Sequence, residues 1–166
     1  EVATSSLLVT DAGYFPRAVA HSRFRPHGTP EAVLLFVSNG RGAVTQQGRI
    51  SVVEAGSVAA LAPNQPHAYE ADAADPWTLW WIHVAGSLAV DWCSLAGASG
   101  APLVTRVGDP VAVTALFDEI LRLMERDTTR ASLLRASGAA WHLMTRFAGA
   151  ETESDAAADP VERSEE

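Results

Sequence analysis

The sequence predicts a mainly β fold, a small barrel or sandwich of short strands followed by two amphipathic helices. Up to about Trp92, short apolar runs alternate with Gly, Pro and Asn turn signals, a rhythm typical of an all-β domain. Beyond Trp92, apolar residues recur three and four positions apart, which is the spacing of one helix face. The length of 166 residues suits one domain that buries its own hydrophobic core.

The predicted strands lie between the turn signals. Residues 38–42, 46–49, 54–56 and 63–66 supply the turns, and Gln47-Gly48 is the predicted tip of a hairpin. The expected strands are 32–38, 41–46, 49–53, 57–61, 67–71 and 77–84.

The helical part is expected to begin at Asp109-Pro110, because an acidic cap followed by proline signals a helix start. The first helix has an apolar stripe of Val111, Leu116, Phe117, Ile120, Leu121, Leu123 and Met124. A second helix is expected over 129–147, and its apolar side holds Leu133, Leu134, Ala140, Trp141, Leu143, Met144 and Phe147.

Charge divides the chain unevenly. The net charge is −8, and residues 150–166 alone hold seven acidic residues and one arginine. We therefore expect three parts: a barrel over 1–108, a helical segment over 109–149, and an acidic, disordered tail or linker over 150–166. The chain has no lysine, and its 12 cationic residues are scattered arginines, so it is not expected to hold DNA by itself.

The sequence also predicts a cytoplasmic protein. The lone Cys93 fits a reducing compartment and is expected to be an inert buried thiol. No run approaches the roughly 18 apolar residues of a membrane helix, and residues 1–6 lack the pattern of a secretion signal.

Two short patterns are similar to the metal-binding motifs of cupin barrels. Cupin enzymes carry His-x-His and then Glu on one strand, because alternate strand residues point inward and can grip one metal together. Here Arg25 stands where the first His would be, before His27 and Glu31, and His67 falls at the spacing of the second motif. A guanidinium cannot ligate a cation. We expect no metal and no cofactor, and a metal-dependent cupin enzyme, an isomerase or dioxygenase using His27, Glu31 and His67, stays the alternative.

The expected strand 77–84 is rich in tryptophan. Strand alternation puts Trp77, Leu79, Trp81 and His83 on one face. An indole-lined barrel interior can pack against the C–H face of a sugar ring while polar neighbours bind the hydroxyls. Tyr69 is placed to add a hydroxyl to the same cavity. The alternative is plain core packing.

Further motifs resemble the N-terminal regulatory domain of the AraC family of transcription regulators. The resemblance covers roughly residues 7–148. Its motifs are Gly13-Tyr14, Arg25-Pro26-x-Gly28, Leu34-Leu35-Phe36-Val37-Ser38-x-Gly40-x-Gly42, Gly56-Ser57-Val58, Pro66-His67-x-Tyr69, Asp75-Pro76-Trp77-Thr78 and Trp80-Trp81-Ile82-His83-Val84-x-Gly86.

The resemblance implies a cupin-like barrel that binds a small effector, commonly a monosaccharide, and helices that pair two subunits. It also implies a C-terminal helix-turn-helix domain, absent from these 166 residues, and an N-terminal arm that closes over the sugar. Leu79 falls where arabinose regulators have a pocket histidine, so arabinose is not expected. The implied ligand-binding residues are Thr10, Arg25, Tyr69, Leu79, Trp81 and His83, and the implied dimerisation residues are Leu133, Leu134, Ser137, Trp141 and Met144.

The sequence thus leads to an effector-binding, dimerising sensor with no catalytic residues. The metal-dependent enzyme is the first rival. A dimerisation module without a ligand is the second.

Overall fold

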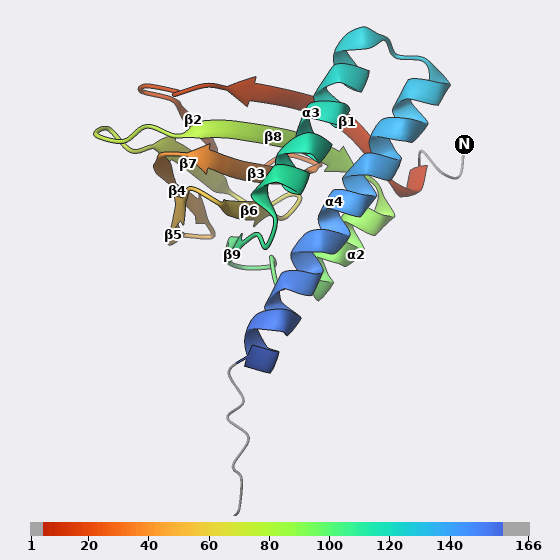
Figure 1. The fold of residues 1–166 in the computed structure, drawn as a ribbon. Coiled ribbons are helices and arrows are strands. Elements are labelled where there is room, and N and C mark those ends of the chain that lie inside the picture. The colour runs from red at the N-terminus through yellow and green to blue at the C-terminus, as the bar shows by residue number, and fades with distance from the viewer. Residues whose placement is uncertain (1–4, 158–166) are drawn as a thin grey trace, which may run out of the picture.

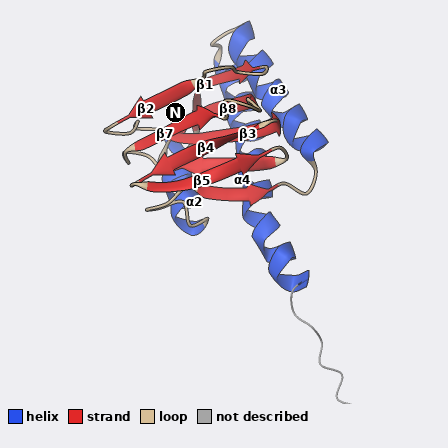
Figure 2. Ribbon diagram, turned by 90° about the vertical axis from the view of Figure 1, so that its left-hand side faces the viewer, coloured by secondary structure: helices blue, strands red, loops and turns tan. Residues whose placement is uncertain are grey.

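The computed structural model describes residues 5–157, with side chains described as far as residue 147. Its strands form two antiparallel sheets that face each other, and helices cover the outer side of one of them (Figures 1 and 2). In chain order the elements are β1 (Leu8–Phe15), β2 (Ser22–Arg25), β3 (Ala32–Asn39), β4 (Arg41–Gln46), β5 (Arg49–Glu54), β6 (Ser57–Leu61), β7 (His67–Ala71), β8 (Thr78–Ala85), α2 (Ser87–Leu95), β9 (Leu103–Arg106), α3 (Pro110–Arg126) and α4 (Arg130–Ala157).

The first sheet has the strand order β1-β8-β3-β6-β9, and the second has the order β2-β7-β4-β5. The chain crosses between the sheets several times, which closes them into a cupin-like barrel. The end strands β1 and β2 follow each other in the chain, so the two sheets meet there. This edge of the barrel is where the polar residues of the next section gather.

Strand β3 shows why the first sheet is hydrophobic on both faces. Its residues from Ala32 to Val37 are all fully buried. Leu35 belongs to the core between the two sheets, whereas Leu34 and Phe36 belong to the core between the sheet and the helices. Burial of each such side chain contributes roughly 1.5–3 kcal/mol, so the two cores together hold the barrel and the helices as one body.

Helices α3 and α4 pack side by side over this sheet (Figure 1). The carboxylate of Asp109 caps α3 by accepting a hydrogen bond from the backbone N–H of Ala112 at 3.1 Å, as the sequence predicted. The Trp92 indole of α2 donates to the backbone carbonyl of Met144 on α4 at 2.9 Å. None of the helices in the described part of the chain is both long and apolar enough to cross a membrane.

The predicted barrel strands are confirmed, with ends that differ by at most one residue. Four elements were not predicted. Strands β2 and β9 are short, β1 is interrupted by polar residues and Gly13, and α2 lies where the apolar pattern changes from one period to the other.

Two further predictions, on the C-terminal tail and on Cys93, can be compared with the structure. Helix α4 continues to Ala157, so the tail expected from residue 150 is helical up to that point, and residues 158–166 lie outside the described residues. Alanine and glutamate, frequent after residue 150, are good helix formers.

Cys93 is buried, as expected, and burial raises the pKa of its thiol to about 11, which keeps it protonated near neutral pH.

Candidate effector-binding site

Trp81 lies on the inner face of β8 and is positioned by a glycine on β1. Gly13 is the strand partner of Trp81. A Cβ atom at Gly13 would lie 2.3 Å from the Trp81 ring, so only glycine permits this approach. The Trp81 Nε1 atom is buried, and within the described part of the chain it has no hydrogen-bond partner.

Arg25 ends β2 beside its strand partner His67 on β7. Its Nη1 atom lies 3.2 Å from the Tyr69 hydroxyl and 3.3 Å from Nε2 of His67. The guanidinium carbon also lies 5.9 Å from the centre of the Tyr69 ring. Because arginine can only donate, Nε2 of His67 is the acceptor and its proton sits on Nδ1, 3.3 Å from the Gln65 carbonyl.

Trp81, Arg25 and Tyr69 line a small cavity at the edge where the two sheets meet, here called the barrel cavity. Its volume is about 70 Å³. Strands β1, β2, β7 and β8 and the β1–β2 connection supply its walls. The lining residues are Asp11, Phe15, His21, Arg23, Arg25, Tyr69, Trp81 and His83.

The barrel cavity combines aromatic faces with neutral imidazoles. Burial and the nearby positive charge of Arg25 lower the pKa of His67 and of His83. Burial and the charge of Arg23 lower the pKa of His21. A histidine whose pKa is lowered is neutral at pH 7, so its ring has one hydrogen-bond donor and one acceptor. Both ring nitrogens of His67 are already engaged, and Nδ1 of His21 accepts from Nε1 of Trp77 at 3.4 Å. His83 is therefore the lining histidine that can offer a donor and an acceptor to a ligand.

Of the predicted ligand-binding residues, Arg25, Tyr69, Trp81 and His83 meet in the barrel cavity. Thr10 and Leu79 do not line it. A β-bulge between Val9 and Asp11 leaves Thr10 exposed, with its hydroxyl 3.4 Å from the His83 carbonyl, and Asp11 lines the cavity instead. Leu79 is fully buried in the core between the sheets.

Sequence reasoning missed four lining residues: Asp11, Phe15, His21 and Arg23. Arg23 could have been predicted, because it lies two positions before Arg25 and alternate strand residues share a face. Asp11 and Phe15 could not have been predicted, because a bulge in β1 cannot be located from the sequence alone.

The alternative metal site does not form. His27 is exposed, and the Glu31 carboxylate accepts a hydrogen bond from the Thr29 hydroxyl, which is the main cause of its lowered pKa. Nε2 of His67 faces the Arg25 guanidinium, which would repel a cation. Among the side chains that the structure describes, up to residue 147, no three of His, Cys, Asp or Glu gather in a group that could hold a metal ion. The described residues therefore do not bring together His27, Glu31 and His67, the set on which the alternative of a metal-dependent enzyme depends.

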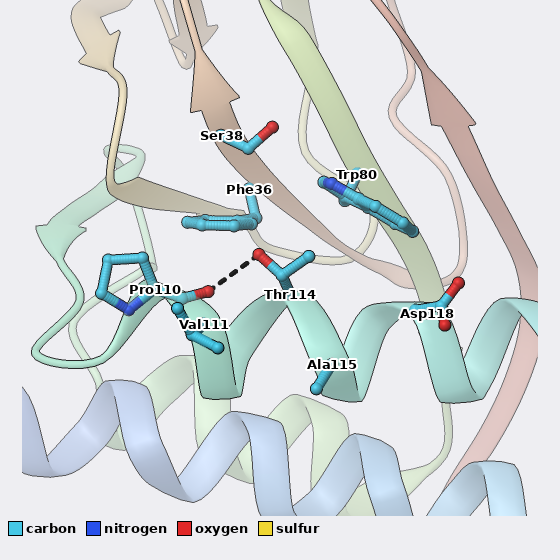
Figure 3. Close-up of a pocket in the computed structure, with 8 residues that line it drawn as sticks. All are labelled: Phe36, Ser38, Trp80, Pro110, Val111, Thr114, Ala115 and Asp118. Carbon is cyan, nitrogen blue, oxygen red and sulfur yellow. Dashed lines mark hydrogen bonds between the residues drawn. The ribbon is translucent and has the colours of Figure 1, made fainter.

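A second cavity, here called the outer cleft, lies between the start of α3 and the outer face of β3 and β8 (Figure 3). Its volume is about 530 Å³. Its polar side chains are largely engaged with each other or with neighbours: the Thr114 hydroxyl donates to the Pro110 carbonyl at 2.8 Å, and the Asp118 carboxylate accepts from Arg122 at 2.7 Å. The lining residues are Phe36, Ser38, Trp80, Pro110, Val111, Thr114, Ala115 and Asp118.

The predicted dimerisation residues lie on different sides of α4. Leu134 and Trp141 are each 40% exposed, and Leu133 is partly buried. Ser137 and Met144 are buried against their own chain. Met144 belongs to the core between the first sheet and the helices. Within this chain, Ser137 and Met144 therefore face the barrel side of α4 and Leu134 and Trp141 face outward. Helix periodicity alone does not say which apolar stripe covers the barrel.

One comparison shows a family. A family model described as AraC-like ligand binding domain matches residues 12–144. The MmsAB operon regulatory protein of Pseudomonas aeruginosa is 33% identical over 101 residues, which cover 58% of this chain and 33% of that protein. The chain thus spans a third of the length of this curated relative.

Two solved structures of ToxT from Vibrio cholerae share the fold. An apo ToxT variant has a TM-score of 0.50 at 12% identity, covering 97% of this chain and 60% of that one. ToxT bound to (E)-4-(8-methylnaphthalen-1-yl)but-3-enoic acid has a TM-score of 0.51 at 10% identity, covering 92% of this chain and 57% of that one. With a family model that matches most of its length, and with a cupin-like barrel and helices as its fold, this chain belongs to the family of AraC-like ligand-binding domains.

Proposed function

We propose that this chain is the sensor part of a transcription regulator: a small effector binds in the barrel cavity, the helices pair two subunits, and the bound effector controls DNA binding by a helix-turn-helix domain elsewhere in the full protein. The observation that carries the proposal is the convergence of Arg25, Tyr69, Trp81 and His83 on one cavity. Four residues from three strands, far apart in the sequence, form one polar and aromatic site.

The effector is proposed to be a small hydroxylated molecule of the monosaccharide kind. The rings of Phe15 and Trp81 offer apolar faces to C–H groups, and their centroids lie 6.0 Å apart. Arg25 donates hydrogen bonds, Asp11 accepts them, and His83 can do either.

A catalytic role is not proposed. The residues that metal-dependent cupin enzymes would need do not come together, and Arg25 occupies the space beside His67. The neutral histidines of the barrel cavity are explained by burial and by arginine charge, which suits recognition as well as proton transfer.

Pairing of two subunits is proposed to use the exposed side of α4. Leu134, Gly138 and Trp141 follow one another at spacings of four and three, so they share one helix face. A Cβ atom at Gly138 would meet no atom within 4 Å, so the face is open to close approach by a second helix. An apolar residue on either side of a glycine is a pattern that suits helix packing.

Control of DNA binding then follows from linkage. An effector shifts the balance between two arrangements of the full protein only if it binds one of them more tightly than the other. The barrel cavity lies beside β1, the first strand of the chain, so the segment preceding β1 is proposed to respond to the occupied site.

The experiment is a thermal-shift screen against monosaccharides with the wild-type chain and with Arg25→Ala, Trp81→Ala and Arg49→Ala. An effector at 100 times its Kd should raise the free energy of unfolding by about 2.7 kcal/mol. We expect Arg25→Ala and Trp81→Ala to abolish the shift. Arg49 is exposed on β5 outside the barrel cavity, so Arg49→Ala is the matched control and should keep the shift. A shift that survives Arg25→Ala and Trp81→Ala would place the effector elsewhere and contradict the proposal.

A further inference from the structure

Arg25 is a half-buried cation without a carboxylate partner. Within the described part of the chain, the ion pairs are Arg41 with Asp72, Arg122 with Asp118, and Arg126 with Asp127. Among the described residues, the hydrogen-bond partners of the Arg25 guanidinium are the Tyr69 hydroxyl and the His67 ring. A charge withdrawn from water normally pairs with an opposite charge, so this guanidinium has capacity for one anionic partner.

The rest of the cavity wall does not neutralise that charge. Arg23 is a second lining arginine without an ion pair among the described residues, and Asp11 is the one carboxylate in the lining. With the histidines neutral, the lining carries one more positive than negative charge. Glu31 lies near enough to Arg25 to feel its charge, but it is outside the lining and is engaged by the Thr29 hydroxyl.

The same positive charge acts on the neighbouring imidazoles. After burial, the charge of Arg25 is the largest cause that lowers the pKa of both His67 and His83. Asp11 and Glu31 act in the opposite direction on His83, but its pKa remains lowered. An anion beside Arg25 would relieve this repulsion.

The volume of the barrel cavity restricts the size of its ligand. At about 70 Å³ it has space for roughly two water molecules. Common ligand sites are several times larger, on the order of 300–1,000 Å³. A whole monosaccharide would need the exposed side chains at the mouth, Phe15 and Arg23, to move aside, whereas a short molecule needs less rearrangement.

Resting on the sensor function proposed above, but with a smaller ligand than a monosaccharide, we infer that the effector is a short-chain hydroxy acid, whose carboxylate is held by Arg25 and whose hydroxyl meets Asp11 or His83. The planar fork of a guanidinium matches two carboxylate oxygens, and Arg23 at the mouth adds a second positive charge. The hydrocarbon part of the acid packs against Trp81. The outer cleft cannot take this ligand, because its one charged lining residue is Asp118.

The test is isothermal titration calorimetry of the full chain with matched pairs that differ only in the acid group: glycerate with glycerol, lactate with propane-1,2-diol, and 3-hydroxybutyrate with butane-1,3-diol. D-galactose is included as a neutral sugar. We expect at least one acid to bind tenfold or more tightly than its neutral partner. Arg25→Gln should remove that preference, and Arg25→Lys should keep part of it, because it retains the charge without the fork.

Two further variants keep the result interpretable. Arg23 is exposed, so Arg23→Gln tests the second positive charge without risk to the fold. This variant should weaken binding of the acid more than binding of its neutral partner. Arg49→Gln, also exposed but outside the cavity, should change neither.

The outcomes separate this inference from the proposed function. If D-galactose or the neutral alcohols bind as tightly as the acids, and Arg25→Gln and Trp81→Ala weaken that binding, the carboxylate inference is overturned and the sensor function stands. If no compound binds saturably, or if Arg25→Gln and Trp81→Ala leave the affinity unchanged, both the carboxylate inference and the sensor function are overturned.

Discussion

The barrel cavity and the outer cleft differ in size, polarity and surroundings, and the smaller one carries the chemistry. The outer cleft holds about 530 Å³ and the barrel cavity about 70 Å³. The cleft is walled by Phe36, Trp80 and the first turns of α3, which belong to or adjoin the core that joins sheet and helices. The cavity gathers arginines, histidines and a tyrosine in one place. Convergent polar groups, rather than empty volume, identify the candidate site.

The largest expected effect concerns the cleft side. Phe36→Ala should lower the free energy of unfolding by about 3–5 kcal/mol, because Phe36 is fully buried and its ring stacks on Phe117 with centroids 5.9 Å apart. Urea unfolding followed by circular dichroism measures the loss. The contrast between the two cavities would be contradicted if Phe36→Ala left the free energy of unfolding nearly unchanged while Arg25→Gln, in the barrel cavity, lowered it by several kcal/mol.

A smaller loss of stability, combined with a loss of binding, is expected from Gly13→Ala. The new methyl group would overlap the Trp81 ring, and forcing extra atoms into packed space costs typically about 1–3 kcal/mol. Effector binding should fail, because Trp81 is displaced from the cavity wall. Gly48→Ala is a control for loss of a glycine, since a Cβ there meets no atom within 4 Å, although its φ of +75° adds backbone strain. Equal loss of binding in both variants would contradict the role given to Gly13.

The dimer prediction concerns a third surface. Trp141→Ala should raise the dissociation constant of the dimer at least tenfold, or about 1.4 kcal/mol, because the exposed indole lies on the proposed pairing face of α4. Sedimentation velocity over a range of concentrations measures this change. Val111→Ala, on the exposed start of α3, is the matched control and should leave the dimer unchanged. A dimer lost only in the Val111 variant would move the interface to the outer cleft.

The smallest effect is a pH dependence that arises in the cavity. The folded-state pKa values of His67 and His83 lie below the ordinary value of 6.5, so the unfolded chain takes up protons first as the pH falls. Stability should therefore be complete above about pH 7.5 and decrease as the pH falls through 6.5. Denaturant midpoints measured at a series of pH values should show this slope, and His67→Gln with His83→Gln should flatten it. An unchanged slope in the double variant would assign the effect to other groups.

Part of the site could be predicted from the sequence by strand alternation, which puts Trp81 and His83 on one face of the expected strand 77–84. Arg25 and Tyr69 were implied by the resemblance to the AraC family, and these four predicted residues line the barrel cavity. Thr10 was placed one residue away from the true lining residue, because the bulge in β1 shifts the register by one position. Bulges depend on pairing between distant strands, which no local pattern records.

The helical part shows the same limit. Periodicity identified both α3 and α4, but Met144 and Trp141 carry equally apolar side chains, and the barrel, not the helix, decides which of them is covered. Helix α2 escaped prediction because its residues, from Ser87 to Leu95, have no strong apolar face. Tertiary contacts, such as the bond from Trp92 to Met144, hold it in place.

The most direct test of the central claim distinguishes Trp81 from Trp80, which are neighbours in the sequence on opposite faces of β8. The chain has five tryptophans, so its indole N–H signals can be resolved by NMR and assigned with Trp80→Phe and Trp81→Phe. On titration with the effector that emerges from the binding screens, we expect the Trp81 signal to shift saturably, because Trp81 lines the barrel cavity, while the Trp80 signal stays in place. A saturable shift of Trp80 with Trp81 unchanged would put the effector in the outer cleft and contradict the account.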